Sequence, residues 1–227
     1  MPDLNDLYLD ESPVTDEGLT NLIPLTGLKL LSLYRTKISD EGLNELRQMP
    51  SLETLILRDT DITDKGLIYL GQVKSLRSLD LSETAVKGET LGQLSNLSRL
   101  TVLNLDNTKV TDNNLETLAG NNRLSDISLA NTEITDEGAK KLALIKSLRK
   151  INLENTNITS DCLDSLATLP YLGTLDLSNT KLDDSCLPAL KKLNGLSILK
   201  LKNCKISQST INQYLRVAGQ CRVHKEP

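Results

Sequence analysis

Six aspartates recur at intervals of 24 or 48 residues, and carboxylates in a row could bind calcium. They are Asp16, Asp40, Asp64, Asp112, Asp136 and Asp184. Each follows a Thr, Ser or Asp and precedes an apolar stripe with helical spacing, which is typical of a helix N-cap followed by an acid in the first turn. The glycine-aspartate loops of calcium-binding repeats are not apparent in the sequence. We therefore interpret these carboxylates as capping groups and expect neither a metal nor a cofactor.

Four cysteines are the candidate nucleophiles: Cys162, Cys186, Cys204 and Cys221. Cys162 and Cys186 occupy equivalent places on adjacent predicted helices, whose axes pack roughly 8–10 Å apart, beyond the ~7 Å Cα separation that a disulfide tolerates. A catalytic cysteine needs a nearby base, and the only histidine is His224 in the tail. We expect four free thiols without a catalytic role, as in a reducing compartment such as the cytoplasm.

Other enzyme signatures are also missing from the sequence. A single histidine removes Ser-His-Asp chemistry and histidine-rich zinc sites, and "GETLGQL" lacks the Lys-Ser/Thr ending of a phosphate-binding loop. The formal net charge of −4 argues against a nucleic-acid partner. No apolar run approaches the ~18 residues of a membrane span, so we expect no membrane insertion.

The elements that position these residues belong to a repeat of 24 residues. "TKISDEGLNEL", from Thr36, returns as "TDITDKGLIYL" from Thr60 and as "TEITDEGAKKL" from Thr132. Aligned on its first leucine, which we number position 1, the unit occurs nine times from Leu4 onward with the consensus LxxLxLxxTxITDxGLxxLxxLxx. Because the chain has no Phe or Trp, its core must be built from stacked Leu, Ile and Val.

The two halves of each unit carry different periods. Positions 4 and 6 alternate with polar residues, which predicts short strands near Asp6–Tyr8, near Leu30–Ser32 and every 24 residues thereafter. Positions 16, 19 and 22 form a helical stripe. One unit cannot bury its apolar face alone, so we expect stacking into a right-handed α/β horseshoe solenoid. One parallel β-sheet would line the concave face and short helices the convex face.

This pattern resembles leucine-rich repeat proteins over nearly the whole chain, and "TxITDxGL" is similar to a subclass common in bacteria. The family's usual Asn at position 9 is Thr in seven units, so we expect the hydroxyl to bond the turn backbone. A similar "ITDEGL" occurs in F-box ubiquitin-ligase receptors, whose units usually carry Cys at position 9. Only Cys204 fits that variant.

We interpret residues 1–227 as a single leucine-rich repeat domain, with nine repeats over 4–219 and a C-terminal cap over 214–227. The tail is interpreted as leaving the repeat register after Val217, with "CRV" as a final half-strand. The strand around Leu7 is expected to have an open edge, which could join further sequence or the second subunit of a homodimer. The fourth unit lacks the Asp and has Gly88 and Gly92, so its helix is predicted to be shorter or distorted.

Position 8 is Asn in five successive units. These are Asn107, Asn131, Asn155, Asn179 and Asn203. Asn tolerates a left-handed backbone and bonds its own turn, so we favour a structural role. The alternative is a polar ladder at the rim of the concave face.

The resemblance and the expected concave sheet favour a non-enzymatic protein-protein interaction scaffold that binds a protein or peptide partner. The alternative is the substrate-recognition arm of a larger enzyme, a ubiquitin ligase or a kinase, whose catalytic domain is absent from this sequence. Carbohydrate recognition ranks last, because it usually calls for several exposed aromatic side chains along the groove.

The candidate partner-binding residues lie on the concave side of the first three units. The apolar ones and Tyr34 are at positions that face away from the buried leucines, and the two arginines flank them. They are Tyr8, Leu30, Tyr34, Arg35, Ile56 and Arg58. Later units carry polar residues at position 5, so the apolar cluster is expected only in the N-terminal third. Tyr and Arg are the residue types that most often anchor interfaces. The alternative is that Tyr8 and Leu30 pack against repeats or a cap outside this sequence.

Overall fold

The computed structural model describes residues 4–225, and these form one ten-stranded sheet in which every neighbouring pair is parallel. The strands are β1 (Asp6–Tyr8), β2 (Leu30–Ser32), β3 (Thr54–Ile56), β4 (Ser78–Asp80), β5 (Val102–Asn104), β6 (Asp126–Ser128), β7 (Lys150–Asn152), β8 (Thr174–Asp176), β9 (Ile198–Lys200) and β10 (Arg222–His224). Their order in the sheet follows the sequence, and the register advances by one 24-residue repeat from strand to strand, as in Leu7 beside Leu31. The predicted strand positions are confirmed.

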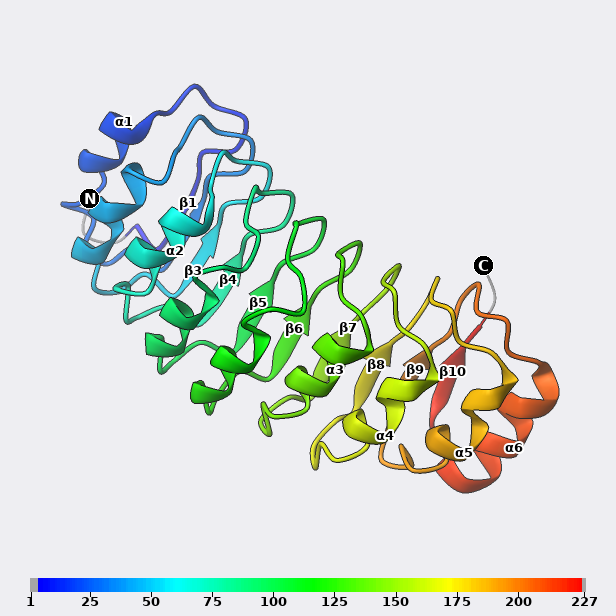
Figure 1. Ribbon diagram of the computed structural model, residues 1–227. Helices are drawn as coiled ribbons and strands as arrows, with labels where there is room; N and C mark the ends of the chain where they lie inside the picture. The colour runs from blue at the N-terminus through cyan, green and yellow to red at the C-terminus, as the bar shows by residue number, and fades with distance from the viewer. Residues whose placement is uncertain (1–3, 226–227) are drawn as a thin grey trace.

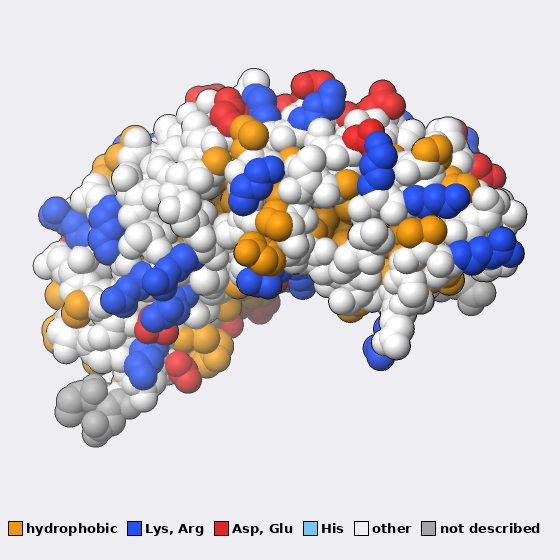
Figure 2. Space-filling model, turned by 90° about the horizontal axis from the view of Figure 1, so that it is seen from below, with side chains coloured by type: hydrophobic (Ala, Val, Ile, Leu, Met, Phe, Trp, Pro, Cys, Tyr) orange, Lys and Arg blue, Asp and Glu red, His pale blue; other side chains and the backbone are white. Residues whose placement is uncertain are grey.

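Short helices lie along one side of this sheet, so the molecule is a two-layered solenoid with β1 and β10 at opposite ends (Figure 1). With η for 3₁₀ segments, they are α1 (Asp16–Thr20), η1 (Gly42–Gln48), α2 (Asp64–Leu70), η2 (Leu91–Asn96), η3 (Leu115–Gly120), α3 (Asp136–Leu142), η4 (Ser160–Cys162), α4 (Leu163–Leu166), η5 (Asp184–Cys186), α5 (Leu187–Leu190) and α6 (Gln208–Ala218). The outline is bent, and Lys and Arg side chains are spread along the face in view (Figure 2). The predicted α/β leucine-rich-repeat solenoid is confirmed.

The core is a continuous stack of leucines between the two layers. At position 4, Leu31, Leu55 and Leu79 follow one another on β2, β3 and β4 with no exposed surface. Burying each such side chain contributes roughly 1.5–3 kcal/mol relative to exposure, so the stacking supplies what the missing Phe and Trp cannot. At the first strand Leu7 is only half-buried, since β1 has a neighbouring strand on one side alone within the described residues.

The turn that leaves each strand uses the residues at positions 8 and 9. In Thr36, Thr108 and Thr180, as in the other position-9 threonines, the hydroxyl donates to the carbonyl at position 6 over 2.5–2.7 Å. Position 8 is left-handed in all nine repeats, with φ between 52° and 59°, which explains the preference for Asn there. The structural role of this Asn row is confirmed, and Asn155 also donates to Asn131 over 2.7 Å along the row, while a functional role of the row stays a hypothesis.

Asp16, Asp64, Asp136 and Asp184 lie in first turns as predicted, whereas Asp40 and Asp112 lie before their helical segments. All six also contact the next repeat. Asp112, in the fifth repeat, lies before η3, and its carboxylate accepts both the N–H (2.9 Å) and the hydroxyl (2.6 Å) of Thr135, which is position 12 of the next repeat. This bond crosses from repeat to repeat and forms a carboxylate ladder. The ladder also accounts for Gly at position 15, because a Cβ at Gly138 would overlap the Asp112 carboxylate.

The fourth unit and the C-terminal tail are the two parts of the chain predicted to depart from the regular repeat. The helical segment of the fourth unit, η2, is a six-residue 3₁₀ segment from Leu91, as η3 is from Leu115, and the distortion specific to the fourth unit is the φ of +94° at Gly88. The tail, however, keeps its register: Val223 pairs beside Leu199, a full repeat away. The predicted register break after Val217 is therefore wrong, because the leucine pattern ends there while the backbone period continues into a complete tenth strand.

Candidate binding surface

The six candidate residues lie on the first three strands and on the turns that follow β2 and β3. Tyr8 is 62% exposed on β1, and the pairing register places it and Ile56 on either side of Ser32. Leu30 lies between Asp6 and Thr54 in the neighbouring row. Leu30 and Ile56 are half-buried, so this end of the sheet presents apolar surface in part to solvent and in part to its own neighbours.

Tyr34 is the centre of a group of direct side-chain contacts on this surface. The guanidinium carbons of Arg35 and Arg58 lie over its ring, 5.5 and 5.4 Å from the centroid. Arg35 in turn pairs with Asp59 at 2.7 Å and with Glu11 at 3.5 Å, and Arg58 pairs with Glu83 at 2.8 Å. Each cation–π contact contributes about 0.5–1 kcal/mol at an exposed site. The arginines therefore hold the ring in place, and their charges are partly neutralised.

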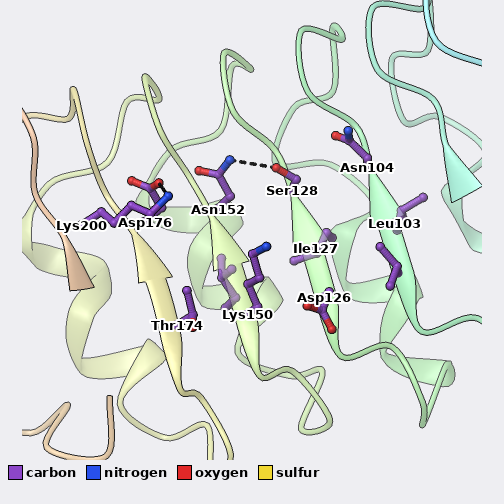
Figure 3. A pocket seen from close by; sticks show the side chains of 12 residues that line it. Leu103, Asn104, Asp126, Ile127, Ser128, Lys150, Asn152, Thr174, Asp176 and Lys200 are labelled. Atoms are coloured by element: carbon purple, nitrogen blue, oxygen red, sulfur yellow. Dashed lines mark hydrogen bonds and ion pairs between the residues drawn. The ribbon is translucent and has the colours of Figure 1, made fainter. Parts of the chain in front are cut away.

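A second part of the concave face was not anticipated. Strands β5 to β9 line a hollow of about 300 Å³ (Figure 3). Val102, one of its lining residues, is 38% exposed. Exposed apolar surface on this face therefore extends beyond the N-terminal third, contrary to the expectation from the sequence. Val102 and Lys150 occupy position 3 of their repeats, so the residue types at position 5 do not reveal this exposed apolar side chain.

Most polar groups in this hollow already have structural partners. The Asn152 carbonyl oxygen accepts the Glu154 N–H over 3.0 Å, and its amide donates to the Ser128 hydroxyl over 2.9 Å (Figure 3). Asp176, 5% exposed, accepts the N–H two residues on and pairs with Lys200 at 3.0 Å. Such i to i+2 bonds explain the Asp or Asn at position 5 in three of these repeats, at Asn104, Asn152 and Asp176. Lys150 is exposed, and no ion pair of it is found within residues 4–225.

Asp106 is the acid whose environment is most altered near this hollow. Burial raises the pKa of its carboxyl, while hydrogen bonds from the Ser128 hydroxyl at 2.6 Å and the Ala130 N–H at 2.7 Å oppose that rise. The repulsion from Asp80 adds to the effect of burial. The Asp106 carboxylate therefore links the turn after β5 to the next repeat, through its hydrogen bonds with Ser128 and Ala130.

The cysteines provide no reactive centre. All four are free and buried, which confirms the prediction of unpaired thiols. Burial raises the pKa of the Cys186 thiol to about 12 and raises that of Cys162 as well. Since the thiolate is the nucleophile, both groups are held in the inert form. Within the described residues, no three His, Cys, Asp or Glu side chains gather as metal ligands would, and no helix has the length and apolar character to cross a membrane.

Comparisons with known proteins agree with this geometry. The family described as "Leucine Rich repeat" matches residues 48–71 and 120–143. The crystal structure of internalin C2 from Listeria monocytogenes is similar, with a TM-score of 0.70 and 26% identity over 87% of this chain and 80% of that one. A second Listeria monocytogenes internalin gives 0.57 and 17% over 99% and 82%, and a TDR receptor gives 0.66 and 13% over 100% and 43%. No curated protein sequence matches the chain.

The last two likenesses show the fold alone, whereas internalin C2 shares both fold and a quarter of its aligned residues. The family match falls on two repeats, and the strand register extends the same unit along the whole sheet. The TxITDxGL subclass stays a prediction. Repeat, register and likeness together identify the chain as a leucine-rich repeat protein.

Proposed function

We propose that this chain is a non-enzymatic scaffold that binds a protein or peptide partner on its concave face, with Tyr8, Leu30, Tyr34, Arg35, Ile56 and Arg58 as the contact residues. The observation that carries the proposal is the Tyr34 ring, which two ion-paired arginines hold over the sheet before any partner arrives. A side chain that is already ordered loses little conformational entropy on association.

The arrangement of the surrounding residues supports the same choice. Tyr34 lies between an exposed Tyr8 on the edge strand and a half-buried Ile56 on the third strand, so a partner would meet aromatic and aliphatic surface within a few strand spacings of ~4.8 Å. The arginine charges face their own acids, which favours a neutral or mixed partner surface over a strongly acidic one. Interface anchors of this composition carry most of the binding energy in protein complexes.

The proposal is tested by capturing partners from a lysate of the source organism with immobilised protein and measuring the affinity for the captured partner. Tyr34→Ala and Ile56→Asp should each weaken binding by more than about 1 kcal/mol, roughly fivefold. Tyr171→Ala is the matched control, because Tyr171 is 58% exposed and has Arg149 over its ring at 4.9 Å but lies before β8. Equal affinity of all three variants and wild type, or unfolding of the first two, would refute the site.

The four unpaired thiols support a reducing compartment such as the cytoplasm as the place of action. Thiol labelling of protein taken directly from cells and unfolded in denaturant should find all four groups reduced. Oxidised cysteines in that sample would refute this assignment.

A further inference from the structure

The carboxylate ladder repeats the same two donors in four rungs, and in two others Lys87 and Ser207 donate the N–H to Asp64 and Asp184. The N–H of position 12 donates to the preceding repeat's Asp in Ser39, Thr63, Thr135 and Thr159, each over 2.9 Å. In these four rungs the hydroxyl of the same residue binds the second carboxylate oxygen over 2.5–2.6 Å. A position-12 Ser or Thr in this fold is therefore a two-point receptor for a carboxylate.

One rung lacks its carboxylate. The residue that precedes Thr111 in the ladder is Gly88, where six other repeats have Asp. Within residues 4–225 no acceptor is found for the Thr111 N–H, and its hydroxyl only accepts a 3.4 Å bond from the Asn113 N–H. The rung before Asp183 also lacks the acid, but there the position-12 residue is itself a carboxylate and would repel another. Among repeats with a neighbour before them, repeat five alone keeps the donor pair without an acceptor.

The structure is hollow at this place. A cavity of about 330 Å³ opens beside Thr111, Asn114 and Gly88. Asn114 takes the position that is Gly in four repeats, and its amide donates two long bonds of 3.4 Å to the Gly88 and Glu89 carbonyls at the side of the hollow. Thr111 lies outside η3, which begins at Leu115, so the donors belong to the ladder and not to a helix end.

The charged side chains around the hollow balance one another. Lys87 and Lys109 line it, as do Glu89 and Glu133, and none of the four has an ion-pair partner within the described part of the chain. The two lysines offset the two acids, so the hollow carries no formal net charge, and the acids repel a dianion such as phosphate more strongly than a monoanion. The hollow is larger than a carboxylate, which leaves space for the methylene groups that would carry it.

We propose that the interrupted rung at Thr111 is a binding site for an external carboxylate, the Asp or Glu side chain of a protein partner, which completes the ladder in place of the missing aspartate. The carboxylate accepts the Thr111 N–H and hydroxyl, as Asp112 accepts those of Thr135 in the next rung. This site lies on the turns between strand and helix, away from the Tyr34 surface, and does not depend on the function proposed above.

The test is a titration of the ¹⁵N-labelled protein with sodium acetate, followed by amide chemical shifts, with sodium chloride at equal concentration as the ionic-strength control. The Thr111 amide should shift and saturate, whereas the Thr135 amide, whose rung is filled, should respond to acetate no more than to chloride. Phosphate should perturb Thr111 less than acetate does. A Thr111 response equal to that of Thr135, or a stronger response to phosphate, would overturn the proposal.

Two variants separate binding from folding. Thr111→Val removes the hydroxyl at nearly constant shape and should lower the affinity for acetate at least fivefold. Lys109→Ala should also lower that affinity, although it keeps the N–H and hydroxyl of Thr111. Thr54→Val on β3 is the matched control and should titrate as wild type does. If Thr111→Val retains wild-type affinity, the carboxylate does not bind at this rung. Should that variant not fold, an unchanged affinity in Lys109→Ala together with an unmoved Thr111 amide in wild type would refute the site equally.

Discussion

At the scale of single residues, aspartate at position 13 lies against glycine at position 15 of the next repeat in three places, Asp16 with Gly42, Asp40 with Gly66 and Asp112 with Gly138. Asp112 needs the space that Gly138 leaves, and a Cβ there would also crowd Ile134 at 2.9 Å. Where the Asp is missing, at Gly88, the next position 15 is free to be Asn114, which takes a left-handed φ of 66°. The Asp and Gly of the "TDxG" motif are therefore explained by a contact between the Asp of one repeat and the Gly of the next.

This coupling gives a prediction. Asp112→Ala leaves the Thr135 N–H and hydroxyl without an acceptor and should lower the free energy of unfolding by about 1–3 kcal/mol. Gly138→Ala should also destabilise, through overlap with the carboxylate. In the double variant the overlap with Asp112 is gone, so the summed cost should be smaller than the sum of the two single costs. Urea denaturation of the four proteins measures this, and strict additivity would contradict the contact.

Asp106 carries a prediction about pH. Burial raises the pKa of this carboxyl above its ordinary 3.8, so the folded state binds the proton more tightly than the unfolded state does. The resulting stabilisation is present below the unfolded-state value and is lost as pH rises through the folded-state pKa. Asp106→Asn, which can still accept from Ser128, should therefore gain stability relative to wild type as pH rises from below 3.8 toward neutrality. Melting temperatures across that range test it, and a constant difference would exclude the effect.

The sequence predicted that the position-13 acids are structural, but it did not predict their hydrogen bonds to the next repeat, for a physical reason. The Asp136 carboxylate and the Thr159 hydroxyl that it binds are 23 residues apart, so nothing in the local pattern shows that they face one another. Similarly, the partners of Arg35 lie one repeat away on each side, at Glu11 and Asp59. Side-chain direction between repeats depends on the stacking distance, which a linear pattern does not contain.

At the scale of elements, the strands were predictable to the residue and the helices were not. Strand positions follow from the burial of positions 4 and 6, which alternation shows directly, as at Leu31 and Leu33. The helical segments mix α and 3₁₀ turns, and several have only three or four residues, as η4 and α4 do. In such short segments hydrogen bonds to neighbouring repeats and the size of position 15 decide the type, so periodicity predicts the side of the solenoid and not the pitch.

The last helix gives a prediction at this scale. Tyr214 on α6 is 1% exposed, and its hydroxyl donates to the Leu193 carbonyl over 3.0 Å, so it closes the end of the leucine stack. Tyr214→Phe should cost about 0.5–1.5 kcal/mol for the lost bond. Tyr214→Ala should cost about 3–5 kcal/mol, because it also opens a cavity. Urea denaturation distinguishes them, and equal costs would mean that the ring does not seal the core.

At the scale of the whole molecule, the two ends are built differently although the repeats are alike. At the C-terminal end α6 and the tenth strand cover the last repeat, and the core residues there, Ile211 and Tyr214, are buried. At the other end Leu4, Leu7 and Leu9 are only half-buried. This asymmetry was predictable from the leucine pattern, which ends in a different way at each terminus. The interpretation of residues 1–227 as one domain remains a prediction.

The last prediction follows from this asymmetry. Repeats contact their neighbours alone, so opening begins at the ends, and the end with less burial opens more easily. Amide hydrogen exchange should therefore be fastest in β1, slowest near β5 and intermediate in β10, where α6 covers the last repeat. The possible homodimer through the edge of β1 adds a second expectation, because pairing with another copy would protect these amides in proportion to protein concentration. A concentration series from micromolar to millimolar, checked by sedimentation, separates the two cases. Fast exchange of β1 at every concentration would refute the dimer, and protection of β1 equal to that of β5 in a monomer would refute the open edge itself.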